Sequence, residues 1–173
     1  DMMRKENMEL VFEGLDTYAD VYLNDECILK ADNMFRRWSI PVRQYIREEN
    51  NILKVYFHSP VKIDVPKWDA LPYQYPASND QSENGGLFNK KISIFARKAG
   101  YHYGWDWGPR LVTSGIWRPV YIRAWSDLRI NDVFIEQKEV GAGRAVIAGH
   151  VELDADKDMD GVLVTITDEA TGR

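Results

Sequence analysis

The sequence contains a single cysteine, Cys27, so no disulfide can form within the chain. For this residue, a role as a small, partly buried apolar side chain is favoured over one as a reactive thiol. The longest apolar runs are far shorter than the about 20 residues that cross a bilayer as a helix. The first residues, DMMRKENMEL, lack the apolar segment of a signal peptide. These absences exclude a disulfide scaffold and a helical membrane span, and they leave the compartment unknown.

Basic residues are not concentrated in any one region. The chain has 22 Lys and Arg against 27 Asp and Glu, a net charge of −5, and its basic residues are spread along the sequence. Nucleic acids and anionic membranes are bound by concentrated positive charge. We therefore expect neither a nucleic-acid partner nor a membrane partner.

Motifs for metal binding and for common hydrolytic machinery are also missing. The sequence has no GxSxG, HExxH or CxxC motif and no glycine-rich phosphate loop. The three histidines lack the spacing of metal ligands: His58, His102 and His150. The acids of the segment 156–161 resemble the first half of a calcium loop, but Thr167 stands where a bidentate Glu is needed. We expect no metal and no cofactor, and an acidic turn at 156–161.

The residues that are present indicate an all-β protein with a hydrophobic core. Hydrophobic residues make up 45% of the chain and charged residues 28%. Short runs with alternating apolar and polar residues, separated by turn residues, predict half-buried antiparallel strands. The predicted strands are 8–12, 20–23, 53–57, 116–125, 130–136, 145–153 and 162–167.

Three other segments have a less regular pattern. Ser39 to Glu49 predicts a helix of about two turns, with Pro41 in its first turn. The segment 59–86 is rich in proline and glycine and predicts a long loop without regular structure, of the kind that is functional or mobile. For 87–95 the periodicity does not decide between a strand and a short helix.

The most distinctive stretch is Ala99 to Trp125, which holds four of the six tryptophans. Gly104 and Gly108 bracket the tripeptide Trp105-Asp106-Trp107 and permit a tight turn on each side. An exposed indole beside a carboxylate suits a sugar, which has an apolar ring face and hydroxyl groups around it. In the alternative interpretation, both indoles fill the core and Asp106 caps a turn. The residues alone favour neither.

The surroundings of this stretch have simpler interpretations. We expect Arg110 and Arg118 to brace the region by ion pairs or by stacking on rings, since arginine does both well. Trp117 and Trp125 lie at strand positions and are predicted to be core residues. The acids of the long loop are predicted to be solvated, because no spacing ties any two of them into a catalytic pair: Asp64, Asp69, Asp80 and Glu83.

Three segments resemble β-mannosidases of glycoside hydrolase family 2. The specific one is RKAGYHYGWDWGPRLVTSGIWRPVYI, residues 97–122, which is similar to a segment near the end of the N-terminal domain of these enzymes. FEGLDTYADVYLND (12–25) resembles an earlier part of that domain, shared more loosely with β-galactosidases and β-glucuronidases. FRRWSIPVRQYIREENNILKVYFHSP (35–60) resembles the stretch that follows it. The resemblance spans residues 8–125.

The resemblance implies an architecture and a reaction. Residues 1–125 would form a galactose-binding-like jelly-roll β-sandwich, incomplete at its N-terminus, and 126–173 the first strands of an immunoglobulin-like sandwich. A (β/α)₈ barrel would follow, so the chain is expected to be part of a longer protein. The implied reaction is hydrolysis of terminal, non-reducing β-D-mannose residues with retention, by two glutamates of that barrel. No catalytic residue is therefore expected in this chain.

The resemblance also implies roles for the aromatic stretch. Trp105 would form a wall of the mannose pocket and Asp106 would accept hydrogen bonds from sugar hydroxyls, while Trp107 and Arg110 would be scaffold. The expected partners are the mannoside substrate and the barrel of the same polypeptide. Dimerisation through unpaired strand edges is a further expectation, and the family is compatible with a periplasmic, extracellular or lysosomal location. The alternatives are a stand-alone carbohydrate-binding module and a purely structural sandwich.

Overall fold

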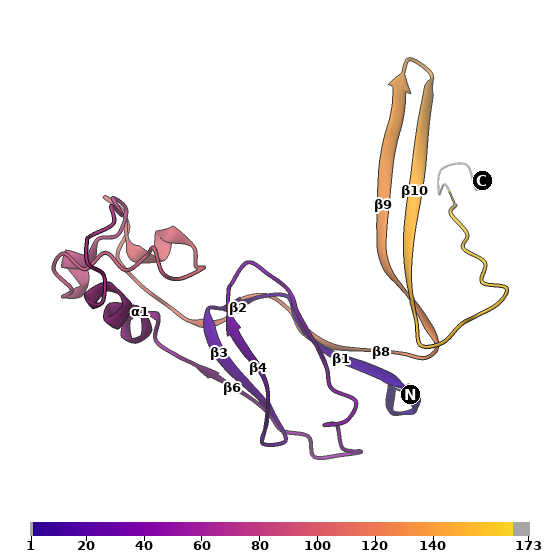
Figure 1. Cartoon of the computed structure of the whole chain (residues 1–173), viewed down its shortest axis with the longest axis horizontal. Coiled ribbons are helices and arrows are strands. Elements are labelled where there is room, and N and C mark those ends of the chain that lie inside the picture. Colours follow the sequence, from indigo (N-terminus) through magenta and orange to yellow (C-terminus); the bar gives the residue numbers. More distant parts are fainter. Residues whose placement is uncertain (1, 168–173) are drawn as a thin grey trace. The chain divides into compact units, whose positions relative to one another are not determined.

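The computed structural model describes residues 2–167 and is mostly β-structure (Figure 1), which confirms the predicted all-β class. The described chain divides into two compact units, residues 7–124 and residues 2–6 with 125–167, and each is described by itself. The strands are β1 Asn7–Phe12, β2 Leu15–Asp16, β3 Tyr18–Leu23, β4 Glu26–Asp32, β5 Trp38–Pro41, β6 Leu53–Phe57, β7 Gly115–Ile116, β8 Val120–Trp125, β9 Leu128–Gly141 and β10 Arg144–Ala155. The helices are α1 Pro60–Asp69 and three 3₁₀ helices, Met2–Arg4, Ser82–Gly85 and Gly100–Tyr103.

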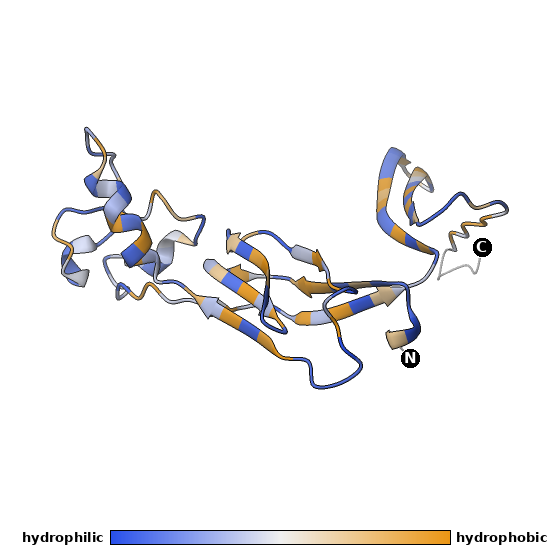
Figure 2. Cartoon of the chain, turned by 60° about the horizontal axis from the view of Figure 1, so that its bottom comes forward, coloured by the Kyte–Doolittle hydropathy of each residue, from blue (hydrophilic) through white to orange (hydrophobic). Residues whose placement is uncertain are grey.

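The first unit contains two three-stranded sheets and one small ladder. Their orders are β5-β1-β8, β4-β3-β6 and β2-β7. Figure 2 shows apolar and polar residues alternating along strands of this unit. In β3 the alternation matches burial, with Ala19, Val21 and Leu23 buried, as predicted for a half-buried strand. The fully buried apolar side chains of these strands and their connections include Val11, Phe12, Leu15, Val21 and Val42.

Strand β1 departs from the predicted alternation. All residues from Met8 to Phe12 are buried, including the acid Glu9. The Glu9 carboxylate accepts a hydrogen bond of 2.5 Å from Nη2 of Arg123, which lies in the neighbouring strand β8. An acid on a buried strand is tolerated when a cation compensates its charge. The prediction of a half-buried strand is therefore wrong for β1.

The helix predicted over Ser39–Glu49 is also wrong. Residues 38–41 form β5, which pairs antiparallel with β1 in the register Leu10↔Ile40. Pairing in the sheet prevails over the weak helical pattern, and Pro41 lies at the end of the strand, where a missing N–H is tolerated. The chain then turns, with the amides of Tyr45 and Ile46 both donating to the Val42 carbonyl.

The helix of this unit lies instead in the predicted loop 59–86. Ser59 is its N-cap, accepting a hydrogen bond of 3.3 Å from the Lys62 amide, and Pro60 occupies the first turn. Both features are typical helix starts. The prediction of no regular structure in 59–86 is thus wrong over Pro60–Asp69. Residues 87–95 form turns, neither the strand nor the helix that was considered.

Helix α1 takes part in a second, smaller core. Trp68 of α1, Ile92 and Tyr103 are its buried centre. Partly buried residues pack around them: Val61, Val65, Leu87, Phe95, Ala96 and Val112. Figure 1 shows α1 and the neighbouring turns gathered at one end of this unit. The aromatic stretch that starts at Ala99 is therefore anchored near its beginning, because Tyr103 is part of this core.

The second unit is built on the β9–β10 hairpin. The two strands pair antiparallel with Phe134 opposite His150 and two irregularities of register. The strands predicted at 130–136 and 145–153 are confirmed and are longer than predicted. The strand predicted at 162–167 is wrong, because those residues have no regular secondary structure in the described chain. Val162 to Thr165 instead border an open hollow of about 280 Å³ beside residues of β9 and β10.

Two further observations concern sequence expectations. Cys27 lies in β4 and is exposed, so the prediction of a partly buried residue is wrong. In the part of the chain that the structure describes, no helix has the length and apolar character needed to cross a membrane.

Candidate functional site

The tripeptide Trp105-Asp106-Trp107 lies on a tight turn. The Trp105 N–H donates to the Gly108 carbonyl and the Gly108 N–H donates to the Trp105 carbonyl, each over 3.1 Å. Reciprocal hydrogen bonds of this kind close a four-residue turn. We call residues 105–108 the WDW turn.

The side chains of the WDW turn face solvent. Trp105 is 42% exposed and Trp107 is 84% exposed, and Asp106 between them is exposed as well. The two indoles touch edge to face, with ring centroids 5.6 Å apart and planes inclined by 68°. The interpretation in which both indoles fill the core is therefore wrong. The turn presents an apolar ring surface with a carboxylate beside it.

Gly104 is required where the chain enters the WDW turn. Its φ is +98°, a conformation that residues with a side chain rarely adopt. A Cβ at this position would lie 3.1 Å from Cβ of Gln81 and 3.3 Å from Cβ of Arg110. The Gln81 amide also donates to the carbonyl of Tyr103, over 2.9 Å. The entry to the turn is therefore packed directly against the segment that carries Gln81.

Arg110 fixes the exit from the turn. Its Nε lies 3.3 Å from Oδ1 of Asp80, and its guanidinium carbon lies 5.6 Å from the centre of the Tyr103 ring. The Asp80 Oδ2 accepts a hydrogen bond of 2.8 Å from the Ser93 amide. The predicted bracing role of Arg110 is confirmed. The prediction that Asp80 is a solvated loop acid is wrong, because its side chain is fully buried.

Asp64 is a second buried acid of the segment predicted to be a loop. Its Oδ1 accepts hydrogen bonds from the Tyr18 hydroxyl over 2.9 Å and from Lys67 Nζ over 2.6 Å. The side chain of Asp64 is fully buried, because α1 carries it toward the sheet that contains Tyr18. Burial raises the pKa of Tyr18, and burial together with the Asp64 charge raises the pKa of Tyr103. Asp64 thus ties α1 to β3. Asp69 and Glu83, by contrast, carry exposed ion pairs with Lys90 and Lys91, as a solvated loop predicts.

Trp117, which lies between β7 and β8, and Trp125, which ends β8, are less buried than predicted. Trp117 is 43% exposed, and its indole N–H donates to the Met34 carbonyl over 3.1 Å. A Cβ added at Gly14 would lie only 2.3 Å from Nε1 of the Trp117 ring, so this ring packs directly on Gly14. The Arg118 guanidinium stacks 4.4 Å from this ring, which confirms the predicted bracing by Arg118. Trp125 is only partly buried and is covered by Arg129.

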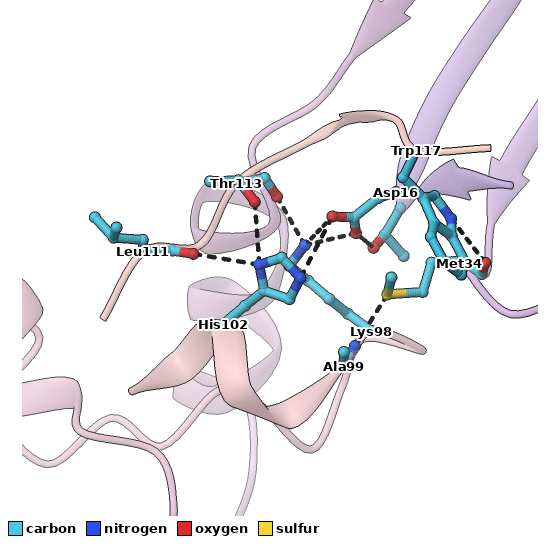
Figure 3. Close-up of polar contacts among 9 residues, drawn as sticks. Asp16, Met34, Lys98, Ala99, His102, Leu111, Thr113 and Trp117 are labelled. Carbon is cyan, nitrogen blue, oxygen red and sulfur yellow. Dashed lines mark hydrogen bonds and ion pairs between the residues drawn. The ribbon is translucent and has the colours of Figure 1, made fainter. Parts of the chain in front are cut away.

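A buried polar cluster at the base of the aromatic stretch was not predicted. Lys98 pairs with Asp16 of β2, with side chains 0% and 6% exposed, and also donates to the Thr113 carbonyl over 2.7 Å. His102 lies beside them, with Nε2 3.8 Å from Oδ2 of Asp16 (Figure 3). Neither Lys98 nor Asp16 has a sequence signal, because they are 82 residues apart and only the fold brings them together.

The remaining histidines lie beside single acids. His58 contacts Asp20 over 2.9 Å, and His150 lies 3.4 Å from Glu136. Among residues 2–167 no group of three or more His, Cys, Asp or Glu side chains is placed to hold a metal ion. The candidate site thus consists of the exposed WDW turn and the buried groups that hold it.

Comparison with known proteins identifies the family. The model for the galactose-binding domain-like region of glycosyl hydrolase 2 proteins matches residues 1–118. The chain belongs to this family. The glycosyl hydrolase 2 match includes the complete WDW turn and its buried base, and it agrees with the predicted galactose-binding-like sandwich.

Relatives within glycosyl hydrolase 2 carry β-mannosidase names. The chain is 38% identical over 128 residues to β-mannosidase B of Thermothelomyces thermophilus, covering 73% of the chain and 14% of the relative. It is 37% identical over 132 residues to the β-mannosidase of Capra hircus, covering 76% of the chain and 15% of the relative. These matches confirm the resemblance to β-mannosidases. The chain spans only about a seventh of the length of these relatives.

A solved structure supports the same assignment. The crystal structure of a β-D-mannosidase from Dictyoglomus thermophilum matches with a TM-score of 0.78 and 33% identity, covering 90% of this chain and 18% of that one. The chain is therefore homologous to the N-terminal domain of β-mannosidases of glycosyl hydrolase 2.

Proposed function

We propose that this chain is the galactose-binding-like part of a retaining β-mannosidase that hydrolyses terminal, non-reducing β-D-mannose residues. In this proposal the WDW turn forms one side of the mannose pocket of a (β/α)₈ barrel in the same polypeptide. The barrel carries the two glutamates of the reaction. The exposure of both indoles around Asp106, on a turn with a buried base, is the observation that carries this proposal.

The chemistry of the turn suits a sugar ring. The exposed face of Trp105 offers apolar contact to the C–H face of a pyranose, and Asp106 offers two acceptor oxygens to adjacent hydroxyls. A hydrogen bond to a charged acceptor is worth about 1.5–3 kcal/mol. Trp107, which touches Trp105 edge to face, limits the orientations that the Trp105 ring adopts.

Pre-organisation is the second support for the proposal. A loop that orders only on binding loses part of the binding energy to conformational entropy. The WDW turn has its own pair of backbone hydrogen bonds, and Arg110 and Gly104 flank it with buried contacts. The cost of ordering is therefore largely met before a sugar arrives.

The isolated chain is expected to be inactive, because in retaining hydrolysis two carboxyls lie about 5–5.5 Å apart and act together. Under the proposal both belong to the barrel. Assay of the purified chain with p-nitrophenyl β-mannoside tests this, and turnover by the chain would overturn it.

A stand-alone carbohydrate-binding module is the second candidate, favoured by the same exposed indole pair. The two candidates differ in what the isolated chain binds. A module binds manno-oligosaccharide or mannan measurably in calorimetry, whereas one wall of a pocket binds almost nothing. A Trp105→Ala variant is the control for any heat observed, because specific binding through the turn requires that ring.

A further inference from the structure

The aromatic stretch is closed at its base by a buried ion pair. Lys98 Nζ donates to both carboxylate oxygens of Asp16, over 2.5 Å to Oδ1, and over 2.7 Å to the Thr113 carbonyl. The lysine side chain is completely buried and that of the aspartate is 6% exposed. Figure 3 shows the amine between the Asp16 carboxylate and Thr113. The ammonium thus joins β2 to a backbone carbonyl five residues beyond the WDW turn.

His102 also links the stretch of chain before the WDW turn to the stretch after it. We call these two stretches the arms of the segment that carries the turn. Its Nδ1 lies 3.0 Å from the Thr113 hydroxyl oxygen and 3.3 Å from the Leu111 carbonyl oxygen, while its Nε2 faces Asp16. Lys98 and His102 precede the WDW turn, and Leu111 and Thr113 follow it. The cluster therefore fixes the distance between the two ends of the segment that carries the turn.

Stability alone does not account for a buried pair of this kind. Taking both charges out of water opposes folding, and well-packed apolar residues at such a site are often equally stabilising. Burial lowers the pKa of Lys98, the direction expected of an amine that loses water. The hydrogen bonds of the Lys98 ammonium, however, constrain the direction as well as the distance between the bonded groups, which apolar packing does not. A directional link is useful where a backbone position has to be set accurately.

We infer that Asp16, Lys98 and His102 are positioning residues that set the placement of the WDW turn. The consequence for sugar binding rests on the proposed function, but the placement itself does not. Removing the Lys98 ammonium frees the Thr113 carbonyl and lets the two arms of the segment separate. The turn then loses its fixed orientation although its own residues are unchanged.

The test uses the chain of 173 residues and two readouts that need no sugar. The first is the far-ultraviolet exciton couplet in circular dichroism from the touching indoles of Trp105 and Trp107, assigned by its loss in Trp107→Phe. The second is hydrogen exchange of the Trp105 and Gly108 amides, which form the two hydrogen bonds of the turn. Both report the turn and not global stability, which is followed separately by thermal unfolding.

The decisive variants are Lys98→Met and the double variant Asp16→Asn/Lys98→Met. The single change is expected to weaken the couplet and to speed exchange of the two amides by about 10- to 100-fold, the factor expected for one lost charge-assisted hydrogen bond. It also lowers the melting temperature, because it leaves a buried carboxylate unpaired. The double variant removes that charge and recovers much of the melting temperature, but its turn stays loose. The double variant also keeps the test usable if the single one fails to fold.

Val21→Ala is the matched control, because Val21 is fully buried in β3 and contacts no member of the cluster through a hydrogen bond. It is expected to lower the melting temperature while the couplet and the exchange of the turn amides stay unchanged at temperatures below unfolding. Three results would overturn the inference: slow exchange and a full couplet in Lys98→Met, restoration of both in the double variant, or their loss in Val21→Ala. These outcomes do not depend on sugar binding, so they would stand even if Asp106→Ala left the mannosidase activity unchanged.

Discussion

Arg110 and Asp80 form an ion pair whose side chains are 5% and 0% exposed, with Nε 3.3 Å from Oδ1. Arg110 lies two residues after the WDW turn, and Asp80 lies 30 residues earlier, in the connection between α1 and the aromatic stretch. The pair therefore couples the position of the turn to the small core around Trp68 and Tyr103. Three predictions concern the groups that hold the turn, and the last concerns the turn itself.

Arg110→Ala is expected to lower the free energy of unfolding by about 3 kcal/mol, because it leaves the buried Asp80 carboxylate without its cation. Urea denaturation of the chain at neutral pH measures this change. Arg97→Ala is the matched control: it breaks the exposed pair with Asp32, worth at most about 1 kcal/mol. Equal effects of the two variants would contradict the assigned role of Arg110.

Gly104→Ala is expected to destabilise the chain and to disturb the entry to the WDW turn. A backbone at φ +98° and ψ 167° is adopted almost only by glycine and costs a residue with a side chain about 1–3 kcal/mol, and the new Cβ would also crowd Gln81 and Arg110. Gly115→Ala provides the comparison, because nothing lies within 4 Å of its added Cβ and its φ is not in the left-handed region. That variant should change the free energy of unfolding by less than about 0.5 kcal/mol. A Gly104 variant as stable as the Gly115 variant would show that the backbone at this point is not constrained.

Tyr103→Phe is expected to change how the free energy of unfolding depends on pH in the alkaline range. Burial raises the pKa of the fully buried Tyr103, so above about pH 10 the unfolded state loses this proton while the folded state keeps it. Stability then falls with rising pH, by about 1 kcal/mol between pH 10 and 11 from this group. The phenylalanine variant lacks that contribution. Urea denaturation of both proteins at pH 9 and pH 11 gives the difference.

At neutral pH the same variant should be nearly as stable as the parent chain. In the described part of the chain the Tyr103 hydroxyl has no hydrogen-bond partner, so its removal breaks no bond. The control is Tyr56→Phe, which removes the hydroxyl of an exposed tyrosine whose ring is 59% exposed. A Tyr103 variant with an unaltered pH profile would contradict the titration assigned to this residue.

Strands and the aromatic segment could be predicted from the sequence because their signals are local. Period-two alternation predicted β3, β6, β9 and β10. The glycines around Trp105 to Trp107 predicted a tight turn on each side of the tripeptide, whereas the tripeptide itself lies in one turn. The helix was assigned to the wrong segment for an instructive reason. A proline in the first turn is a valid helix signal, and it holds for Pro60, which follows the N-cap Ser59. Pro41 instead ends strand β5, which pairs with β1.

The buried ionic groups could not be predicted because their signals are not local. Asp64 and Asp80 look like ordinary loop acids until α1 and the 3₁₀ turns fold around them. Asp16 and Lys98 come into contact only in the folded chain. There β2 pairs with β7, which joins residues about a hundred positions apart in one ladder. Sequence patterns report which residues a single element buries, whereas these contacts depend on how separate elements pack.

Under the proposed function Asp106 contacts the mannose, and steady-state kinetics of the longer protein proposed to contain this chain test that contact most directly. Asp106→Ala is predicted to lower kcat/KM for p-nitrophenyl β-mannoside by about 10- to 100-fold, with an unchanged melting temperature, because one charge-assisted hydrogen bond to the sugar is lost. Glu48→Ala, which removes an exposed acid elsewhere in the first unit, should leave kcat/KM unchanged. An Asp106→Ala enzyme that is folded and as active as the parent would contradict the account.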